Sequence, residues 1–187
     1  MKIRPYKEAD RDFVRYVCIN CDGPHNMSED TVHFILSTYC DYYIEKEGHN
    51  CFVATDENDN AIGYILCAEN FHNFYEALKN EYIPRIPEEN TTERYYAGHS
   101  AVLQEKYQDT YPAHLHIDLL PEYQRMGIGR RLIDTLCEHL RNKKIPGVML
   151  SVSKENTGGI KFYENYGFTH LESSSEGEAY GIRFINP

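Results

Sequence analysis

The sequence lacks any long apolar run, and this absence excludes several classes of protein. None of its hydrophobic stretches approaches the roughly 20 residues that a membrane-spanning helix needs. The chain starts with Met1-Lys2-Ile3-Arg4 and leads straight into polar sequence, without the apolar region of a secretory signal peptide. We therefore expect a cytoplasmic protein with no membrane partner.

Basic residues are also scarce. The 187 residues include 19 Lys and Arg against 29 Asp and Glu, a formal net charge of -10 at pH 7. Nucleic-acid binding requires a basic surface, so we expect no nucleic-acid partner. An acidic chain attracts cationic molecules, but net charge alone identifies none of them.

Cysteine spacing gives little support for a metal site. The six cysteines are scattered, and without a secretory signal a reduced interior is expected. Cys18 and Cys21 form a Cys-x-x-Cys pair with His25 nearby, which would suit a metal or redox site. No second Cys/His pair lies at zinc-ribbon spacing, so we predict no bound metal.

The most informative stretch begins with a strand pattern. Polar His114, His116 and Asp118 alternate with apolar residues, as expected for a strand with one polar face. From Ile128 to Leu140 apolar residues recur every fourth position, as on one face of a helix. The sequence therefore predicts a strand, a turn and a helix in direct succession.

The turn between them carries Gly127 and Gly129. Glycine has no Cβ, so a ligand can approach the backbone closely. The first N–H groups of the following helix lack internal partners and point outward at the positive end of the helix dipole, which suits phosphate binding. Arg125, Arg130 and Arg131 add a local basic cluster. We predict a site for a polyanion; an ordinary turn with solvated arginines is the alternative.

Two segments resemble elements of the GNAT acetyltransferase superfamily. The Gln/Arg-x-x-Gly-x-Gly/Ala loop of that family is matched by Gln124-Arg125-Met126-Gly127-Ile128-Gly129. The segment 156–168 resembles the family's Asn-x-x-Ala-x-x-x-Tyr-x-x-x-Gly-Phe element, with Gly159 in place of the usual Ala. The clear match covers roughly residues 113–171. The resemblance implies an α/β fold with helices flanking a central, mostly antiparallel sheet, splayed at the strand that binds acetyl-CoA.

The resemblance also implies which residues hold the coenzyme. Backbone N–H groups of Leu119 and Leu120 would polarise the thioester carbonyl, and their strand would pair with the pantetheine arm. Asn156 would cap a helix and contact pantetheine, and Phe162 would serve as a core aromatic as well. The implied coenzyme-binding set comprises Leu119, Leu120, Gln124, Arg125, Met126, Gly127, Ile128, Gly129, Arg130, Asn156, Gly159 and Phe162.

Acetyl transfer to an amine requires a base and a proton donor, because a lysine-like amine has a pKa of about 10.4 and the leaving thiolate one of about 8.5. Asp118 lies on the polar face of the strand just before the turn, and we predict it as the base, with His116 as second choice. Tyr163 matches the family's thiolate-protonating tyrosine. The alternatives are structural: a loop anchor for Asp118, a core aromatic for Tyr163, and hydrogen-bonded core histidines for His114 and His116.

Together these features predict an acetyl-CoA-dependent N-acetyltransferase that acetylates a primary amine by direct attack on the thioester. A non-catalytic acyl-CoA-binding module and a protein-interaction module on the same scaffold are the alternatives. The His116-Ile117-Asp118 and Phe162-Tyr163 sequences further resemble the acetyltransferase-like domain that ends some O-GlcNAcases, and its free-standing bacterial relatives. The acceptor stays open among small amines, amino sugars, peptide amines and protein lysines.

The remaining pattern suits one domain over residues 1–187. The first helix should bury Phe13, Val14 and Val17. Strands are expected at 2–6, 51–56, 61–68, 148–153, 168–173 and 180–185, and helices at 8–20, 28–45, 128–143 and 156–167.

Residues 70–112 form an unusually long connection, which we predict to be a helical insertion near the acceptor end of the cleft. Helices are expected at 71–82 and 91–107. An aromatic face would close over the acceptor, and a structural flap or homodimer surface is the alternative. This face would comprise Tyr95, Tyr96, His99, Tyr107 and Tyr111.

Overall fold

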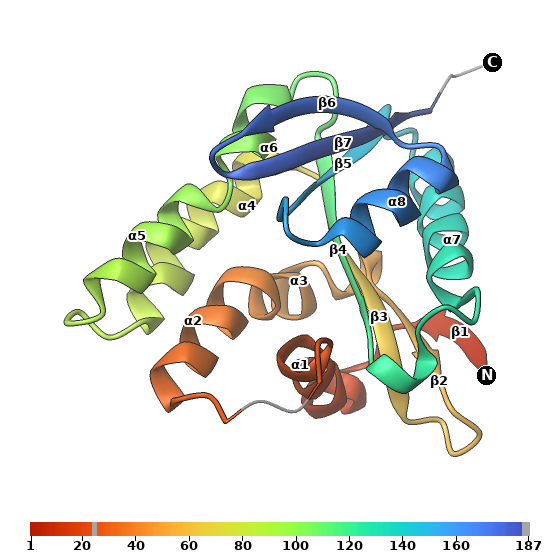
Figure 1. Cartoon of the computed structure of the whole chain (residues 1–187), viewed down its shortest axis with the longest axis horizontal. Helices are drawn as coiled ribbons and strands as arrows, with labels where there is room; N and C mark the ends of the chain where they lie inside the picture. The colour runs from red at the N-terminus through yellow and green to blue at the C-terminus, as the bar shows by residue number, and fades with distance from the viewer. Residues whose placement is uncertain (24–25, 185–187) are drawn as a thin grey trace.

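The computed structural model describes residues 1–23 and 26–184, which form one seven-stranded sheet with helices on both faces (Figure 1). The strands are β1 (Lys2–Pro5), β2 (Phe52–Thr55), β3 (Ala61–Ala68), β4 (Ala113–Leu119), β5 (Gly147–Val152), β6 (Thr169–Ser174) and β7 (Gly177–Arg183). The main helices are α1 (Arg11–Asn20), α2 (Glu29–Tyr39), α3 (Asp41–Lys46), α4 (Phe71–Ala77), α5 (Thr91–His99), α6 (Val102–Tyr107), α7 (Ile128–Asn142) and α8 (Thr157–Tyr166).

The strand order is β1-β2-β3-β4-β5-β7-β6, and every neighbouring pair is antiparallel except β4 and β5. This confirms the predicted mixed, mostly antiparallel sheet. Strands β4 and β5 pair only through Ala113 with Val148 and His114 with Met149, and then separate (Figure 1). The predicted splay is therefore present, and it opens the sheet beside the second half of β4.

Each face of the sheet carries its own core. Helices α7 and α8 cover one face, where Leu115 packs with Leu132 and Leu136. Helices α1 to α4 cover the other, where Val14 packs with Tyr64. The predicted apolar face of α7 is confirmed, since its inward leucines are fully buried, each worth about 1.5–3 kcal/mol of burial free energy.

Several predicted helices are shorter than expected. The helix expected at 28–45 is divided at Cys40, whose backbone leaves the helical conformation (φ -130°, ψ -61°), and the chain continues in α3 from Asp41. The helix expected at 91–107 breaks at Ser100, whose hydroxyl donates to the Ala97 carbonyl at 2.8 Å and competes with the helical pattern. The helix expected at 71–82 widens into a π-helical turn over Leu78–Tyr82.

Two further expectations need correction. Phe13 was predicted to be buried on the first helix but is 44% exposed, while Val14 and Val17 fill the core. The last strand begins at Gly177 rather than at 180, because the hairpin turn with β6 is tighter than predicted. His25, which was considered beside Cys18 and Cys21 and not predicted as a metal ligand, and the strand end predicted at 185 lie outside the described residues. Within 1–23 and 26–184 no helix is both long and apolar enough to cross a membrane.

Candidate active site

A cavity of about 690 Å³ lies where β4 separates from β5. Four parts of the chain line it: the residues just after α1, the end of β4, the turn that leads into α7, and α8 with its cap. Among the predicted coenzyme-binding residues, those that line it are Leu119, Gln124, Arg125, Gly127, Gly129, Arg130, Asn156, Gly159 and Phe162. Asp118 and Tyr163 line the same cavity, and His116 does not.

The backbone of β4 corrects one prediction. The N–H of Leu120 donates to the Ile62 carbonyl at 3.0 Å, so it faces β3 and is not free to polarise a thioester. Since N–H groups of successive residues in a strand face opposite sides, those of Ile117 and Leu119 face the gap left by β5. Ile117 and Leu119 therefore replace Leu119 and Leu120 as the candidate backbone donors.

The turn before α7 has the geometry of an anion site. Arg125 and Gly127 both have positive φ angles, 59° and 78°. Successive N–H groups in such a conformation form a concave anion-binding surface. A Cβ at Gly127 would meet nothing within 4 Å, so glycine is favoured there by its backbone conformation and not by crowding.

Packing between helices, and not only the predicted close approach of a ligand, explains the glycine at position 129. A Cβ on Gly129 would lie 3.1 Å from the Phe162 ring, so this glycine lets α7 pack against α8. Two members of the predicted loop, unlike Gly129, lie outside the lining of the cavity. Met126 is 57% exposed, and Ile128 is buried in the core beneath α7.

Side chains fix the position of this turn. Gln124 donates through Nε2 to the carbonyls of Cys21, at 2.9 Å, and Leu119, at 3.0 Å, and so ties the end of α1 to the end of β4. Arg130 lies over the Tyr166 ring at 4.8 Å and donates to the Asn165 carbonyl at 3.3 Å. Arg130 is thereby held at the cavity, beside the anion-binding turn.

Asn156 caps α8 as predicted. Its Oδ1 accepts the N–H of Gly159 at 2.8 Å. A Cβ at position 159 would come within 2.8 Å of the Asn156 amide nitrogen. The closeness of this cap accounts for glycine where the family element usually has alanine.

Asp118 is held by a partner that sequence reasoning missed. The hydroxyl of Tyr64, which lies opposite on β3, donates to Asp118 Oδ2 at 2.5 Å. Burial raises the pKa of Asp118 to about 6, against hydrogen bonds from Tyr64 and Cys21 that lower it, and with a smaller upward contribution from the charge of Asp22. The carboxylate is therefore mostly ionised at pH 7 yet basic enough to accept a proton.

Tyr163 approaches the same space from α8. It is 9% exposed, and no residue in the described ranges hydrogen-bonds its hydroxyl. Burial, and then the charge of Asp118, raise the pKa of Tyr163 above its usual value. The phenol consequently stays protonated at neutral pH and is able to donate.

The two histidines of β4 have separate surroundings. His114 is buried, and its Nε2 lies 2.9 Å from the Tyr43 hydroxyl, which supports a structural role. Burial lowers the pKa of His114 to about 3 and that of His116 to about 4, so both rings are neutral at pH 7. His116 packs edge-on against the rings of Tyr39 and Tyr43.

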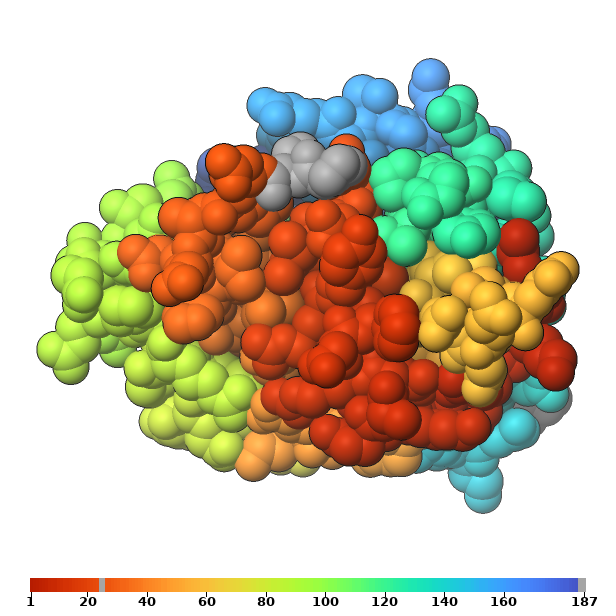
Figure 2. Space-filling view, turned by 90° about the horizontal axis from the view of Figure 1, so that it is seen from below, coloured from red at the N-terminus to blue at the C-terminus, as the bar shows by residue number. Residues whose placement is uncertain are grey.

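His116 lines a second cavity of about 660 Å³. The insertion contributes Tyr96, His99, Ser100 and Leu103 to its wall. In Figure 2 the yellow-green insertion forms one end of the molecule, away from the teal loop before α7.

The predicted aromatic face of the insertion is divided in the structure. Tyr96 and His99 line the second cavity. Tyr95 is 59% exposed outside it, Tyr111 is buried in a core beside Met149, and the hydroxyl of Tyr107 donates to Glu172 of β6 at 3.0 Å. The expectation that these aromatics act together is therefore wrong.

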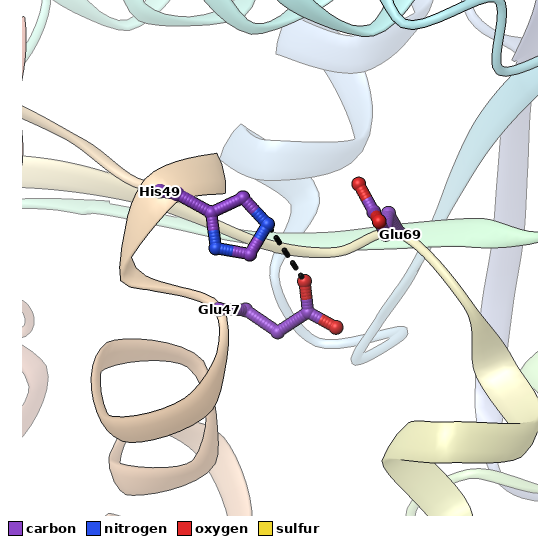
Figure 3. Close-up of side chains that lie close together, drawn as sticks. All are labelled: Glu47, His49 and Glu69. Atoms are coloured by element: carbon purple, nitrogen blue, oxygen red, sulfur yellow. Dashed lines mark ion pairs between the residues drawn. The ribbon is translucent and has the colours of Figure 1, made fainter.

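Glu47, His49 and Glu69 are close enough to suggest an ion site (Figure 3). Their negative charge already has partners in the chain. Asn50 donates to Glu47 at 2.6 Å and to Glu69 at 3.0 Å, and Lys143 forms an ion pair with Glu69. We interpret the cluster as a polar tie between the start of β2, the end of β3 and α7.

Comparison with known proteins identifies the fold and its family. A model of the acetyltransferase (GNAT) family matches residues 21–168. The chain belongs to the GNAT acetyltransferase family. This confirms the predicted membership of the GNAT acetyltransferase family.

Similarity to individual proteins extends over the whole fold in some cases and over a short segment of sequence in others. The crystal structure of SsHAT has a TM-score of 0.84 and 26% identity, with 97% of each chain covered. The PaiA N-acetyltransferase from Thermoplasma acidophilum, solved in complex with coenzyme A, has a TM-score of 0.61 and 17% identity over 98% of each chain. A mycothiol acetyltransferase from Acidothermus cellulolyticus is 40% identical over 50 residues, which is 27% of this GNAT chain and only 15% of that protein.

Proposed function

We propose that this GNAT-family protein acetylates a primary amine, using acetyl-CoA and direct attack of the amine on the thioester. One observation carries the proposal. A buried carboxylate with a pKa near 6, Asp118, and a buried phenol, Tyr163, line one cavity with an anion-binding turn. These are the base, the acid and the coenzyme site that acetyl transfer requires.

Coenzyme binding would use the splay and the turn together. The pyrophosphate would lie on the N–H groups of residues 125–129, with Arg125 and Arg130 beside it. The pantetheine arm would pair with the free edge of β4, in the way a peptide adds a strand to a sheet. The N–H groups of Ile117 and Leu119 would then face the thioester carbonyl and stabilise its developing negative charge.

Transfer would proceed with balanced proton movements. Asp118 takes one proton from the ammonium form of the acceptor, and the free nitrogen attacks the carbonyl carbon. As the C–N bond forms and the C–S bond breaks, the thiolate takes the phenol proton of Tyr163. Tyr163 regains the proton that the nitrogen loses as the amide forms, and Asp118 releases its proton to water. The products are the N-acetylated amine and free coenzyme A.

A panel of amines supplied with acetyl-CoA tests this function directly. The panel contains an alkylamine, a diamine, glucosamine and a lysine peptide, and release of the coenzyme thiol reports turnover. Acetylation of at least one amine supports the proposal. Tight acetyl-CoA binding without turnover of any amine would favour the non-catalytic acyl-CoA-binding module instead.

The anion-binding turn leads to a prediction about affinity. Gly129→Glu should lower acetyl-CoA affinity by at least about tenfold, because like charges placed together cost several kcal/mol. Gly129→Ala is the matched control, since it brings the Cβ to Phe162 without the charge. Calorimetry should show a much smaller loss for alanine. Equal losses in the two variants would mean that packing, and not the phosphate site, accounts for the effect.

Tyr64 provides a prediction about pH. Its hydroxyl stabilises the ionised form of Asp118, so Tyr64→Phe should raise the pKa of that carboxyl further. The acid limb of kcat/KM should move upward by about one pH unit, as expected for a lost hydrogen bond to a charge. Tyr42→Phe, which removes a buried hydroxyl bound to Glu47, is the control. An unmoved acid limb in Tyr64→Phe would limit Tyr64 to a structural role.

Two narrower points are proposed with this function. Residues 1–187 act as one domain, which is supported by a sheet that takes its strands from both ends of the described chain. The resemblance to the acetyltransferase-like domain of O-GlcNAcases rests on His116-Ile117-Asp118 and Phe162-Tyr163. A chain of that kind would serve as a protein-interaction module. The amine panel distinguishes such a module from an enzyme, because only an enzyme would acetylate an amine.

A further inference from the structure

The second cavity lies beside the reaction centre on the side away from the coenzyme turn. His116 in its wall and Asp118 in the coenzyme cavity are two residues apart on the same face of β4. Glu155 of the second cavity and Asn156 of the first are adjacent in the chain. A molecule in the second cavity therefore has its inner end near the carboxylate that accepts the proton.

One part of the wall of this cavity is aromatic and uncharged. Phe34 and Tyr39 of α2, Tyr96 of α5 and the neutral ring of His116 line it. The faces of aromatic rings attract cations, by about 0.5–1 kcal/mol at exposed positions.

Carboxylates gather at another part of the wall. Glu155 follows β5, and Glu176 lies in the hairpin turn between β6 and β7. The hairpin is seated tightly there, because a Cβ on Gly177 would come within 2.6 Å of the Val152 carbonyl. This contact fixes Glu176 on the same side of the cavity as the segment that follows Val152.

The positive charge in the lining is smaller than the negative charge. Lys154 is the cationic side chain in it, and its charge also acts on Glu178, whose pKa it helps to lower after hydrogen bonds from Ser173 and His170. Arginine is absent from this lining, among the residues that the structure describes. The wall thus disfavours an anionic acceptor and favours one with positive charge beyond the reacting amine.

We propose that the second cavity binds the acceptor, and that the acceptor is a primary amine bearing a second positive charge, which Glu155 and Glu176 recognise. The inference rests on the proposed acetyltransferase function. A free diamine and a lysine side chain in a basic peptide share this chemistry, and the experiment includes both.

The test compares 1,5-diaminopentane with n-pentylamine, which has the same chain without the second charge. We expect kcat/KM to favour the diamine by about tenfold, as two weak ion pairs and an aromatic contact would give. Calorimetry in the presence of coenzyme A should show the same preference in affinity. A blocked peptide with two neighbouring lysines is assayed beside the diamine, and the better substrate shows whether the acceptor is a free diamine or a lysine side chain of a polypeptide.

Two sets of variants locate the preference. Glu155→Gln combined with Glu176→Gln should lower kcat/KM for the diamine about tenfold and so abolish the preference for the diamine over pentylamine. Glu57→Gln combined with Glu88→Gln makes the same charge change at exposed positions outside the lining of both cavities, and should preserve it.

A second pair of variants tests the aromatic wall. Tyr96→Ala should raise the acceptor KM several-fold. Tyr95→Ala, the adjacent exposed tyrosine outside the lining, should not. Light scattering on both variants detects any change in oligomeric state, and a KM change that only accompanies dissociation would overturn the role of Tyr96 in the cavity.

The outcomes separate this inference from the function on which it rests. Equal kcat/KM for diamine and pentylamine, or a preference for glucosamine, overturns the inference while the acetyltransferase stands. Absence of turnover with every amine contradicts the proposed function. In that case the calorimetric preference, and its loss in the Glu155 and Glu176 double variant, still decides what the cavity binds.

Discussion

Asp118→Asn should lower kcat by roughly 10²–10⁴-fold, the range typical of lost general-base assistance. Asparagine keeps the size of the side chain and can still accept the Tyr64 hydroxyl. The variant therefore removes basicity and little else. Acetyl-CoA affinity, measured by calorimetry, should be nearly unchanged, because the turn at residues 125–129 contacts the pyrophosphate in the proposed complex.

The pH dependence gives this prediction a second readout. In the unmodified protein the base must be ionised, so kcat/KM should fall as pH drops through about 6, the raised pKa of Asp118. Asp118→Asn should lose that limb. Its activity should rise toward the pKa of the amine, about 10.4, where free amine forms without assistance.

Asp22→Asn is the matched control, since Asp22 is a second carboxylate in the lining of the same cavity. Its charge raises the pKa of Asp118, so the acid limb should move slightly downward and kcat should hold. If Asp118→Asn retains full kcat while His116→Ala is inactive, the base is His116. That result would also mean that the base acts from the second cavity.

Tyr163→Phe should lower kcat by a similar factor, roughly 10²–10⁴-fold, through loss of the proton donor to the thiolate. Phenylalanine keeps the ring, which packs against Phe162 and Phe168, so the fold and the acetyl-CoA affinity should be preserved. An acetyl donor with a more acidic thiol should restore much of the rate. Such a thiolate leaves without needing a proton, which isolates the step that Tyr163 assists.

Tyr166→Phe serves as the control on the same helix. Its hydroxyl donates to Asp134 at 2.7 Å and lies outside the lining of the coenzyme cavity. We expect its kcat to stay within a few-fold of the unmodified protein, since no proton of the reaction passes through it. A loss equal to that of Tyr163→Phe, or a failure of the acidic thiol to restore the Tyr163 variant, would remove Tyr163 from the proton-donor role.

The effects of Asp118→Asn and Tyr163→Phe should be distinguishable because the two groups act at opposite ends of one transition state. High pH should rescue the first variant and not the second. The acidic thiol should rescue the second and not the first. If neither change affects turnover, and no amine is acetylated by the unmodified protein, the binding-module alternative becomes the better account.

Local patterns in the sequence were sufficient to predict several elements of the fold. Three patterns depend only on neighbours within a few residues. They are the alternation of polar and apolar residues around Asp118, the apolar residue at every fourth position from Ile128 to Leu140, and the helix cap at Asn156. Backbone conformation imposes the same kind of constraint at Gly127, where φ is 78°. These features placed the strand, the turn and the two helices correctly before any tertiary contact was known.

Tertiary structure decided which side chains meet. The contact of Tyr64 with Asp118 depends on the register between β3 and β4, which no local pattern specifies. The same pairing turns the N–H of Leu120 toward Ile62 and leaves that of Leu119 facing the gap. Gly129 is needed because Phe162, from a helix far along the chain, packs against it.

The division of the site into two cavities also lay beyond the sequence. His116 and Asp118 share one face of β4, and a periodic pattern treats them alike. Separation of β5 from β4 after His114 gives each a different environment, one beside the coenzyme turn and one beside the insertion. The chain's local patterns specified the strand, and long-range packing assigned different surroundings to its side chains.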